Sequence, residues 1–248
     1  MSGHSKWHNI RLKKGKMDAE RGKTFTKISR EIIMAARAGG GNPDANLRLR
    51  MAIQKARENS MPADKIKSAI QRGTGEIEGA IYEEITYEGY GPAGVAVLVE
   101  CATDNRNRTV AEIRSRFSKH GGNLGEAGCV NWLFSPRGIV SIPRNGRSED
   151  EVLELALEAG AEDIKTEEEA FDVYTAPEDL AAVRTALEGA GLAVSNAEVT
   201  MLPSTTVHLD GKAALQTLRL LEVLEDLDDV QNVYANFELD EAALAAVS

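Results

Sequence analysis

The spacing of apolar residues predicts helices in the first third of the chain and a mixture of helices and strands in the rest. Between residues 18 and 38, apolar side chains recur every three or four positions, the period of a helix with one buried face. Asn42 and Pro43 predict the start of a second helix, which ends near Asn59. A third helix is predicted after Met61-Pro62 and ends at Gly73, so residues 1–75 form an N-terminal arm and a small helical domain.

Beyond Gly75 the apolar period changes repeatedly between 2 and 3.6 residues, which is typical of an α+β protein. Strands are predicted at 81–87, 95–102, 130–134, 139–143, 163–167, 171–176, 194–201, 205–209 and 232–239. Helices are predicted between them, at 106–120, 150–159, 178–190 and 212–226.

The order of these elements predicts two ferredoxin-like domains, one inserted in the other. Residues 137–201 have the order strand, helix, strand, strand, helix, strand, which is the order of a split βαβ unit. Without this segment, residues 76–136 and 202–248 repeat the same order, with 81–87 as an extra strand. The predicted fold class is therefore α+β, with a basic arm and helical domain followed by a discontinuous and an inserted ferredoxin-like domain.

Charge is divided unevenly along the chain. The net charge of the 248 residues is −10, and such a field taken alone would repel phosphates. Residues 1–75, however, contain 17 Lys and Arg against 6 Asp and Glu, whereas residues 76–248 contain 12 against 33. Such segregation indicates a basic segment that contacts nucleic acid and an acidic remainder that discourages non-specific binding.

The cations of the first third lie in the arm and on the polar faces of two predicted helices. Trp7 stands among the basic residues of the arm, where it would either stack on a base or anchor the arm to the protein body. On the helix of residues 18–38, the cations gather opposite the apolar stripe. The predicted nucleic-acid-binding residues are Lys6, Trp7, His8, Arg11, Lys13, Lys14, Lys16, Lys23, Lys27, Arg30, Arg37, Arg48 and Lys55.

A second basic cluster begins at the sequence TDNRNRT, residues 103–109. Asp104 and its neighbouring asparagines are suited to cap the following helix, whose first turn contains Arg106 and Arg108. Helix N-termini attract anions, and arginine binds phosphate with two hydrogen bonds, so both arginines are also predicted to bind nucleic acid. The alternative is that they pair with acids of the protein itself, and the sequence leaves both open.

Other short motifs are better explained by structure than by chemistry. The GxGxxG pattern of Gly89, Gly91 and Gly94 leads into a strand and not into a helix, which predicts a turn between strands and not a dinucleotide site. His4 and His8 lack the further ligands of a metal site. Cys101 and Cys129 lie in apolar contexts typical of reduced core thiols.

Catalysis is not predicted. The sequence has no convincing nucleophile with its base, paired carboxylates, phosphate loop or metal set. Asp226, Asp228 and Asp229 are suited to a divalent ion, but a polar turn between helix and strand explains them better. The prediction is therefore a protein that is not an enzyme and has no cofactor or metal. No apolar run approaches the ~20 residues of a membrane span and no secretory signal is recognised, which predicts the cytoplasm and no membrane partner.

Four stretches of the sequence closely resemble the YebC/PmpR family, whose eukaryotic relatives include a mitochondrial translational activator. They are GHSKWHNIRLKKGKMDAERGKTFTKISREI, AARAGGGNPDANLRLRMAIQKARENSMPADKIKSAIQRGTGE, YEGYGPAGVAVLVECATDNRNRTVAEIRSRFSKHGGNLGE and LEDLDDVQNVYANFEL. The resemblance implies a helical N-terminal domain, two α/β domains and no enzymatic activity. It also places residues 6–16 in the basic N-terminal motif of the family, and Arg106 and Arg108 in its TDNRNRT motif.

The resemblance implies two roles in gene expression. The family is described as transcriptional regulators that bind promoter DNA, and as ribosome-associated factors that help translation through stretches such as prolines. A DNA-binding transcriptional regulator is the first prediction. An RNA-binding translation factor, which contacts ribosomal or messenger RNA and the ribosome, is the close alternative, and a protein-interaction module is another. Trp7 and the glycine-bearing arm favour RNA. The sequence does not indicate an oligomeric state.

Overall fold

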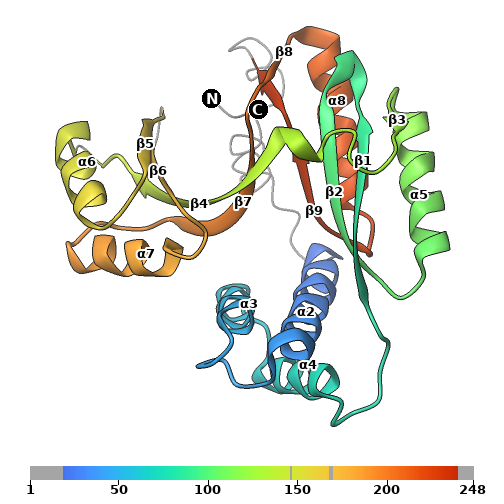
Figure 1. Ribbon diagram of the computed structural model, residues 1–248, viewed down its shortest axis with the longest axis horizontal. Helices are drawn as coiled ribbons and strands as arrows, with labels where there is room; N and C mark the ends of the chain where they lie inside the picture. The colour runs from blue at the N-terminus through green and yellow to red at the C-terminus, as the bar shows by residue number, and fades with distance from the viewer. Residues whose placement is uncertain (1–18, 146, 168–169, 240–248) are drawn as a thin grey trace. The chain divides into compact units, whose positions relative to one another are not determined.

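The computed structural model describes residues 19–145, 147–167 and 170–239, with helices first and sheets after them (Figure 1). These residues form two compact units, one of residues 132–206 and one of the described residues before 132 and after 206. The predicted α+β class is confirmed. None of the described helices is long and apolar enough to cross a membrane.

Three helices form the N-terminal part, α2 (Ala19–Gly39), α3 (Leu47–Glu58) and α4 (Ala63–Thr74). Their apolar stripes meet in one core, which includes Ile28, Ile32, Ala35, Leu49, Ala52, Ala56, Ile66 and Ala69. The helical period seen in the sequence is therefore the buried face of each helix.

The second helix starts later than the sequence predicts, because Asn46 and not Asn42 is its N-cap. The Asn46 side chain accepts a hydrogen bond from the backbone N–H of Leu49 (3.1 Å) and donates to the carbonyls of Ala35 (2.7 Å) and Gly40 (2.9 Å). The buried amide thus caps α3 and also ties it to the end of α2.

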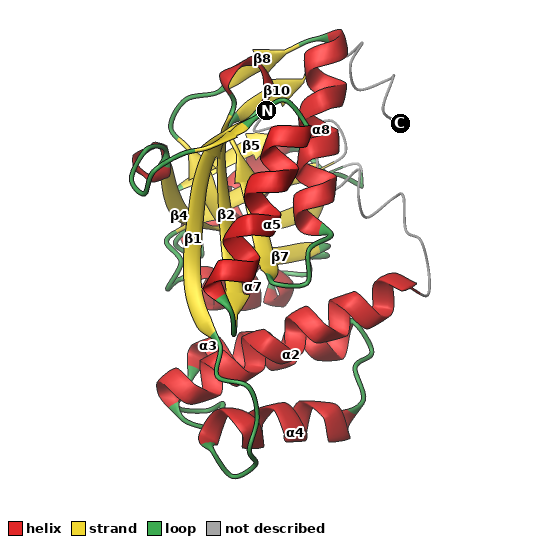
Figure 2. Cartoon of the chain, turned by 90° about the vertical axis from the view of Figure 1, so that its right-hand side faces the viewer, coloured by secondary structure: helices red, strands yellow, loops and turns green. Residues whose placement is uncertain are grey.

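The larger sheet has the order β3-β1-β2-β9, with every pair antiparallel. Its strands are β1 (Glu83–Tyr90), β2 (Ala96–Thr103), β3 (Asn123–Leu124) and β9 (Val230–Ala235). Helices α5 (Arg106–Lys119) and α8 (Gly211–Glu225) lie side by side over one face of this sheet (Figure 2). The core between helices and sheet includes Val97, Val99, Ile113, Phe117, Leu221 and Val233.

Two strands of this sheet were assigned wrongly from the sequence. The predicted strand at 130–134 is a 3₁₀ turn, η2 (Asn131–Leu133), and β8 (Val207–Leu209) pairs with β10 (Phe237–Leu239) outside the sheet. The strand predicted as an extra one, β1, takes the position between β2 and β3. The strand order is still that of a ferredoxin-like sheet. β1 takes the place of the motif's third strand, because it forms a hairpin with β2 that pairs eight residues.

The inserted unit contains β4 (Phe134–Pro143), α6 (Glu149–Glu158), β5 (Asp163–Thr166), β6 (Ala170–Thr175), α7 (Leu180–Gly189) and β7 (Asn196–Pro203). Its sheet order is β5-β6-β4-β7 with antiparallel neighbours, which is the ferredoxin-like order. β4 and β7 begin and end outside the predicted segment of 137–201, and the exact domain boundaries stay a prediction.

The glycine pattern at residues 89–94 lies at the β1–β2 connection. Gly89 belongs to β1, and the 3₁₀ turn η1 (Pro92–Gly94) leads directly into β2, so the predicted turn between strands is confirmed. A Cβ atom at Gly89 would lie 2.6 Å from the backbone oxygen of Asn123 and 2.8 Å from the ring of Phe117. Glycine is required here because β3 and α5 approach the backbone closely.

Gly89→Ala is expected to destabilise the protein by roughly 1–3 kcal/mol, because neither a strand backbone nor a fully buried ring can move aside cheaply. Urea denaturation followed by circular dichroism measures this loss. Gly22→Ala is the control, since Gly22 is exposed on α2 and a Cβ there meets nothing within 4 Å. Equal unfolding midpoints for the two variants would contradict the close approach at Gly89.

Candidate nucleic-acid interface

The arm residues predicted to bind nucleic acid lie outside the described residues. They are Lys6, Trp7, His8, Arg11, Lys13, Lys14 and Lys16, and their role stays a prediction. The remaining predicted residues lie on α2, α3 and the start of α5, where their surroundings are described.

Lys23 and Lys27 of α2 contact the end of α8 and the loop that follows it. The Lys23 ammonium lies 3.1 Å from a carboxylate oxygen of Asp226, and Lys27 donates to the backbone carbonyl of Glu225 at 2.5 Å. These partners follow more than 190 residues later in the sequence, so the α2 face that lacks acids of its own receives them from elsewhere in the chain. This face is thus occupied, at least in part, by the protein itself.

Arg30 is the most buried cation on that face of α2. Its side chain is 12% exposed, and its guanidinium lies 2.9 Å from the carboxylate of Asp229. It also donates to the backbone carbonyls of Asp228 and Ala102, and it lies over the ring of Tyr82. Arg30 therefore joins α2 to the end of β2 and to the α8–β9 loop.

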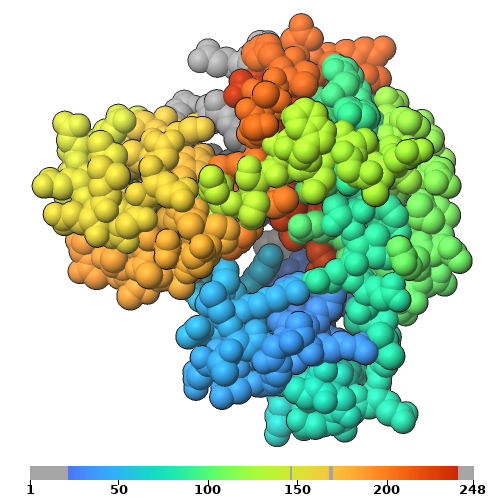
Figure 3. Space-filling view, in the orientation of Figure 1, coloured from blue at the N-terminus to red at the C-terminus, as the bar shows by residue number. Residues whose placement is uncertain are grey.

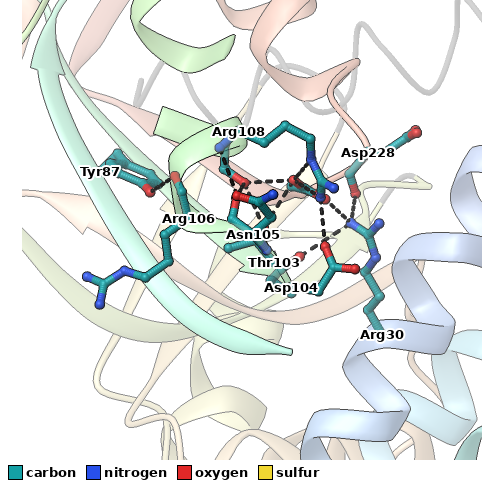
Figure 4. Close-up of polar contacts among 11 residues, drawn as sticks. Arg30, Tyr87, Thr103, Asp104, Asn105, Arg106, Arg108 and Asp228 are labelled. Atoms are coloured by element: carbon teal, nitrogen blue, oxygen red, sulfur yellow. Dashed lines mark hydrogen bonds and ion pairs between the residues drawn. The ribbon is translucent and has the colours of Figure 1, made fainter. Parts of the chain in front are cut away.

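Asp229 is the common acceptor in a polar network, to which Arg30 donates from α2 and Arg108 from α5. Figure 4 shows the side chains of these two arginines pointing toward one another. The Asp229 side chain is only 4% exposed. Its second carboxylate oxygen accepts hydrogen bonds from Arg108 (2.7 Å), the Thr109 hydroxyl (2.7 Å) and the Thr103 hydroxyl (3.2 Å). Burial raises the pKa of Asp229, but the hydrogen bonds from Arg108 and Thr109 and the charge of Arg30 outweigh it, and the pKa lies below its ordinary value.

The two arginines of the TDNRNRT motif have different surroundings. Arg108 lies between Asp229 and Asp104, with ion pairs of 2.7 and 2.8 Å, and the hydrogen bonds to both carboxylates raise its pKa. Arg106 points to solvent with a side chain that is 68% exposed, and its one described ion pair, to Glu83, is long at 4.0 Å. Arg108 therefore pairs with acids of the protein itself, whereas Arg106 remains accessible.

The start of α5 is built from the same motif. Asn105 caps the helix by accepting from the backbone N–H of Arg108 (3.1 Å), and the Thr103 hydroxyl accepts from the N–H of Asn105 (2.9 Å). Thr103 and Thr109 are buried, and their hydroxyl oxygens lie 2.7 Å apart beside the Asp229 carboxylate. The motif thus serves the fold by positioning Arg108 against Asp229.

The predicted residues of α3 also separate into paired and accessible cations. Arg48 lies 2.7 Å from Glu31 of α2 and also contacts Glu84 of β1, and its pKa is raised chiefly by the hydrogen bond to Glu31, although burial opposes this. Lys55 of α3 and Arg37 of α2 are exposed and form no ion pair with the described residues.

The accessible cations of the helical part form what we call the outer basic set. They are all exposed and form no ion pair with any residue that the structure describes, and they are Arg37, Arg50, Lys55, Arg57, Lys67 and Arg72. Figure 3 shows α2, α3 and α4, in blue to teal, at the molecular surface. Arg50, Arg57, Lys67 and Arg72 were not among the residues predicted from the sequence to bind nucleic acid, although they are exposed cations of α3 and α4.

Where α2, α5 and the α8–β9 loop meet, an open polar depression has a volume of about 590 Å³. Its lining includes Lys23, Arg108 and Arg116, but also Asp104, Glu112, Asp226 and Asp228. Since its lining contains both cations and carboxylates, this depression does not offer a uniformly cationic surface for phosphate. No group of three or more His, Cys, Asp or Glu suited to a metal ion occurs among the described residues.

Comparison with known proteins assigns nearly the whole chain to one family. The sequence profile of the TACO1/YebC protein N-terminal domain matches residues 5–76, and that of the TACO1/YebC second and third domain matches residues 82–237. The chain belongs to the TACO1/YebC family. This confirms the resemblance found in the sequence, and the gap between the two profiles falls at the connection from α4 to β1 of this TACO1/YebC chain.

Relatives in the TACO1/YebC family align over their full length. A "Probable transcriptional regulatory protein" from Pelotomaculum thermopropionicum is 56% identical over 243 residues, which cover 97% of this chain and all of that protein. A protein of the same name from Persephonella marina is 54% identical over 250 residues and covers both chains completely. The crystal structure of a conserved hypothetical protein from Aquifex aeolicus, 51% identical, superposes with a TM-score of 0.81 over 90% of this chain and 93% of that one.

Proposed function

We propose that the protein is a cytoplasmic regulator of gene expression that binds duplex DNA and catalyses no reaction. The names of its relatives support a role in transcriptional regulation. The observation that carries the proposal is the outer basic set. Its cations remain accessible, whereas Lys23, Arg30 and Arg48 form ion pairs with acids of the protein itself.

The charge of the helical part suits the phosphate backbone of nucleic acid. Residues 22–75 contain 11 Lys and Arg but only four acids, Glu31, Asp44, Glu58 and Asp64, and Glu31 is engaged by Arg48. Accessible cations on a rigid helical scaffold displace counterions from a polyanion without an entropy cost for ordering the scaffold. The paired cations Lys23, Lys27, Arg30 and Arg48 hold this scaffold in place and are supporting residues in the proposal.

The variant Arg50→Gln/Arg57→Gln/Lys67→Gln tests the proposal. Each lost phosphate contact lowers the slope of log affinity against log salt by about 0.9, so three lost contacts lower it by about 2.7. The fall in affinity for a promoter DNA duplex between about 50 and 200 mM salt should then shrink by roughly one and a half decades. Fluorescence anisotropy across a salt series measures both quantities.

The matched control is Arg144→Gln/Arg147→Gln/Arg184→Gln, which makes the same change of charge in the inserted unit. These cations lie against the Phe171 ring, Glu151 and Glu188 respectively. The control should keep the wild-type slope. A wild-type protein without salt-dependent affinity for DNA would overturn the proposal, and tighter binding to a ribosomal RNA hairpin than to DNA would move the function to translation.

A further inference from the structure

The cations of the acidic remainder are concentrated on two helices. Residues 76–248 contain 12 Lys and Arg, and seven of them lie on α5 and α8: Arg106, Arg108, Arg114, Arg116, Lys119, Lys212 and Arg219. The other five belong to the inserted unit. In a part of the chain with a large excess of acids, this concentration sets the outer face of α5 and α8 apart.

At one end of this face, the last turn of α5 and the first turns of α8 border a depression of about 350 Å³. It is lined by Lys119, His120, Gly121, Lys212, Leu215, Gln216 and Arg219, and we call it the α5–α8 basic depression. No carboxylate is among these lining residues. Lys119, Lys212 and Arg219 are exposed and make no ion pair with the described part of the chain.

The two ends of α5 thus differ in what their cations do. At its start, Arg108 is held by Asp104 and Asp229, beside a depression of mixed charge. At its end, Lys119 faces two cations of α8 across a depression with no acid in its lining. A cation without a partner gains most from an external anion, so Lys119 and the two cations of α8 are better suited to bind one than Arg108 is.

We infer that the α5–α8 basic depression is a second contact site for the sugar–phosphate backbone of the nucleic acid bound by the outer basic set. Three exposed cations around a depression with no carboxylate in its lining suit a ligand with several negative charges, such as a polyanion. Leu215, which is 50% exposed, supplies an apolar surface for sugar carbons among the cationic residues of the lining. The inference rests on the proposed function, because it assigns a second site to the same ligand.

Chemical labelling of the native protein tests the site without any substitution. Lys119 and Lys212 should become less reactive towards an amine-directed reagent, read by mass spectrometry, when a short DNA duplex is added. Lys165 of the inserted unit, exposed beside the Tyr174 ring, should keep its reactivity. Protection of Lys67 without protection of Lys119 and Lys212 would overturn this inference and leave the proposed function standing.

The variant Lys119→Gln/Lys212→Gln/Arg219→Gln gives the energetic test. Its salt slope for DNA should fall by about 2.7, and the effect should add to that of Arg50→Gln/Arg57→Gln/Lys67→Gln because the two sites share no residues. Its circular dichroism should match the wild type, since all three side chains are exposed. A wild-type slope in this variant refutes the second site alone, whereas absence of DNA binding by the wild type refutes both proposals.

Discussion

Replacing Asp229 by alanine is expected to lower the free energy of unfolding by roughly 3–5 kcal/mol, the cost of removing one partner from a buried ionic network. Asp229 is the shared acceptor for Arg30 and Arg108 and for the hydroxyls of Thr103 and Thr109. Without it, the guanidinium of Arg30 stays buried with its charge uncompensated, and the cost is therefore larger than that of losing an exposed pair.

Urea denaturation followed by circular dichroism measures the loss, and amide hydrogen exchange locates it. Exchange should accelerate in α5 and β9 and stay unchanged in β4 and β6, which belong to the inserted unit. Asp226→Ala is the control, because the Asp226 carboxylate is 64% exposed and its pair with Lys23 should contribute less than about 1 kcal/mol. A midpoint for Asp229→Ala equal to that of the control would show that the network does not stabilise the fold.

The same carboxylate gives the stability a defined dependence on pH. The pKa of Asp229 is lower in the folded protein than in the unfolded chain, so its contribution is fully present above the unfolded pKa of about 4. It is lost as pH falls through the folded pKa. The difference in stability between the wild type and Asp229→Ala should therefore be constant near neutral pH and shrink in acid.

The helices and the inserted sheet could be predicted from the sequence because their signals are local. The apolar stripe of residues 18–38 gave α2, and alternation of strand and helical patterns gave the order of elements between β4 and β7. Strand partners in the larger sheet were harder to predict, since the sequence predicted strands at both 81–87 and 205–209. Which of the two strands joins the sheet depends on the pairing of β1 with β2, and this pairing cannot be seen in either segment alone.

The candidate site shows the same limit. Segregation of charge was visible in the sequence, but the partners of Lys23 and Arg30 lie about 200 residues away in the α8–β9 loop. Helical periodicity shows which cations share a face of α2 but not what that face meets. Arg108 illustrates this most clearly, since the sequence left open whether it binds phosphate or acid, and its ion pair with Asp229 joins residues that lie 121 positions apart.

Glu88→Ala is expected to cost about 3 kcal/mol or more, because one buried carboxylate satisfies three backbone N–H groups that would otherwise be unpaired. The Glu88 residue is 6% exposed and accepts from the N–H groups of Gly128 (2.6 Å), Val130 (2.8 Å) and Asn131 (2.7 Å). Burial raises the pKa of Glu88, but the three hydrogen bonds outweigh it and lower the pKa. This carboxylate holds residues 128–131 in a turn, which includes the first two residues of the strand predicted at 130–134.

The effect of Glu88→Ala should be concentrated in the turn, and hydrogen exchange of the Gly128, Val130 and Asn131 amides measures it directly. Glu88→Gln should lose less stability, because its amide oxygen still accepts hydrogen bonds although its NH₂ group cannot. Glu83→Ala on the same strand is the control, since Glu83 is exposed and its described ion pair is long, and it should change stability by less than about 0.5 kcal/mol. Unchanged exchange at residues 128–131 in Glu88→Ala would mean that the turn forms without this carboxylate and that the local sequence alone directs it.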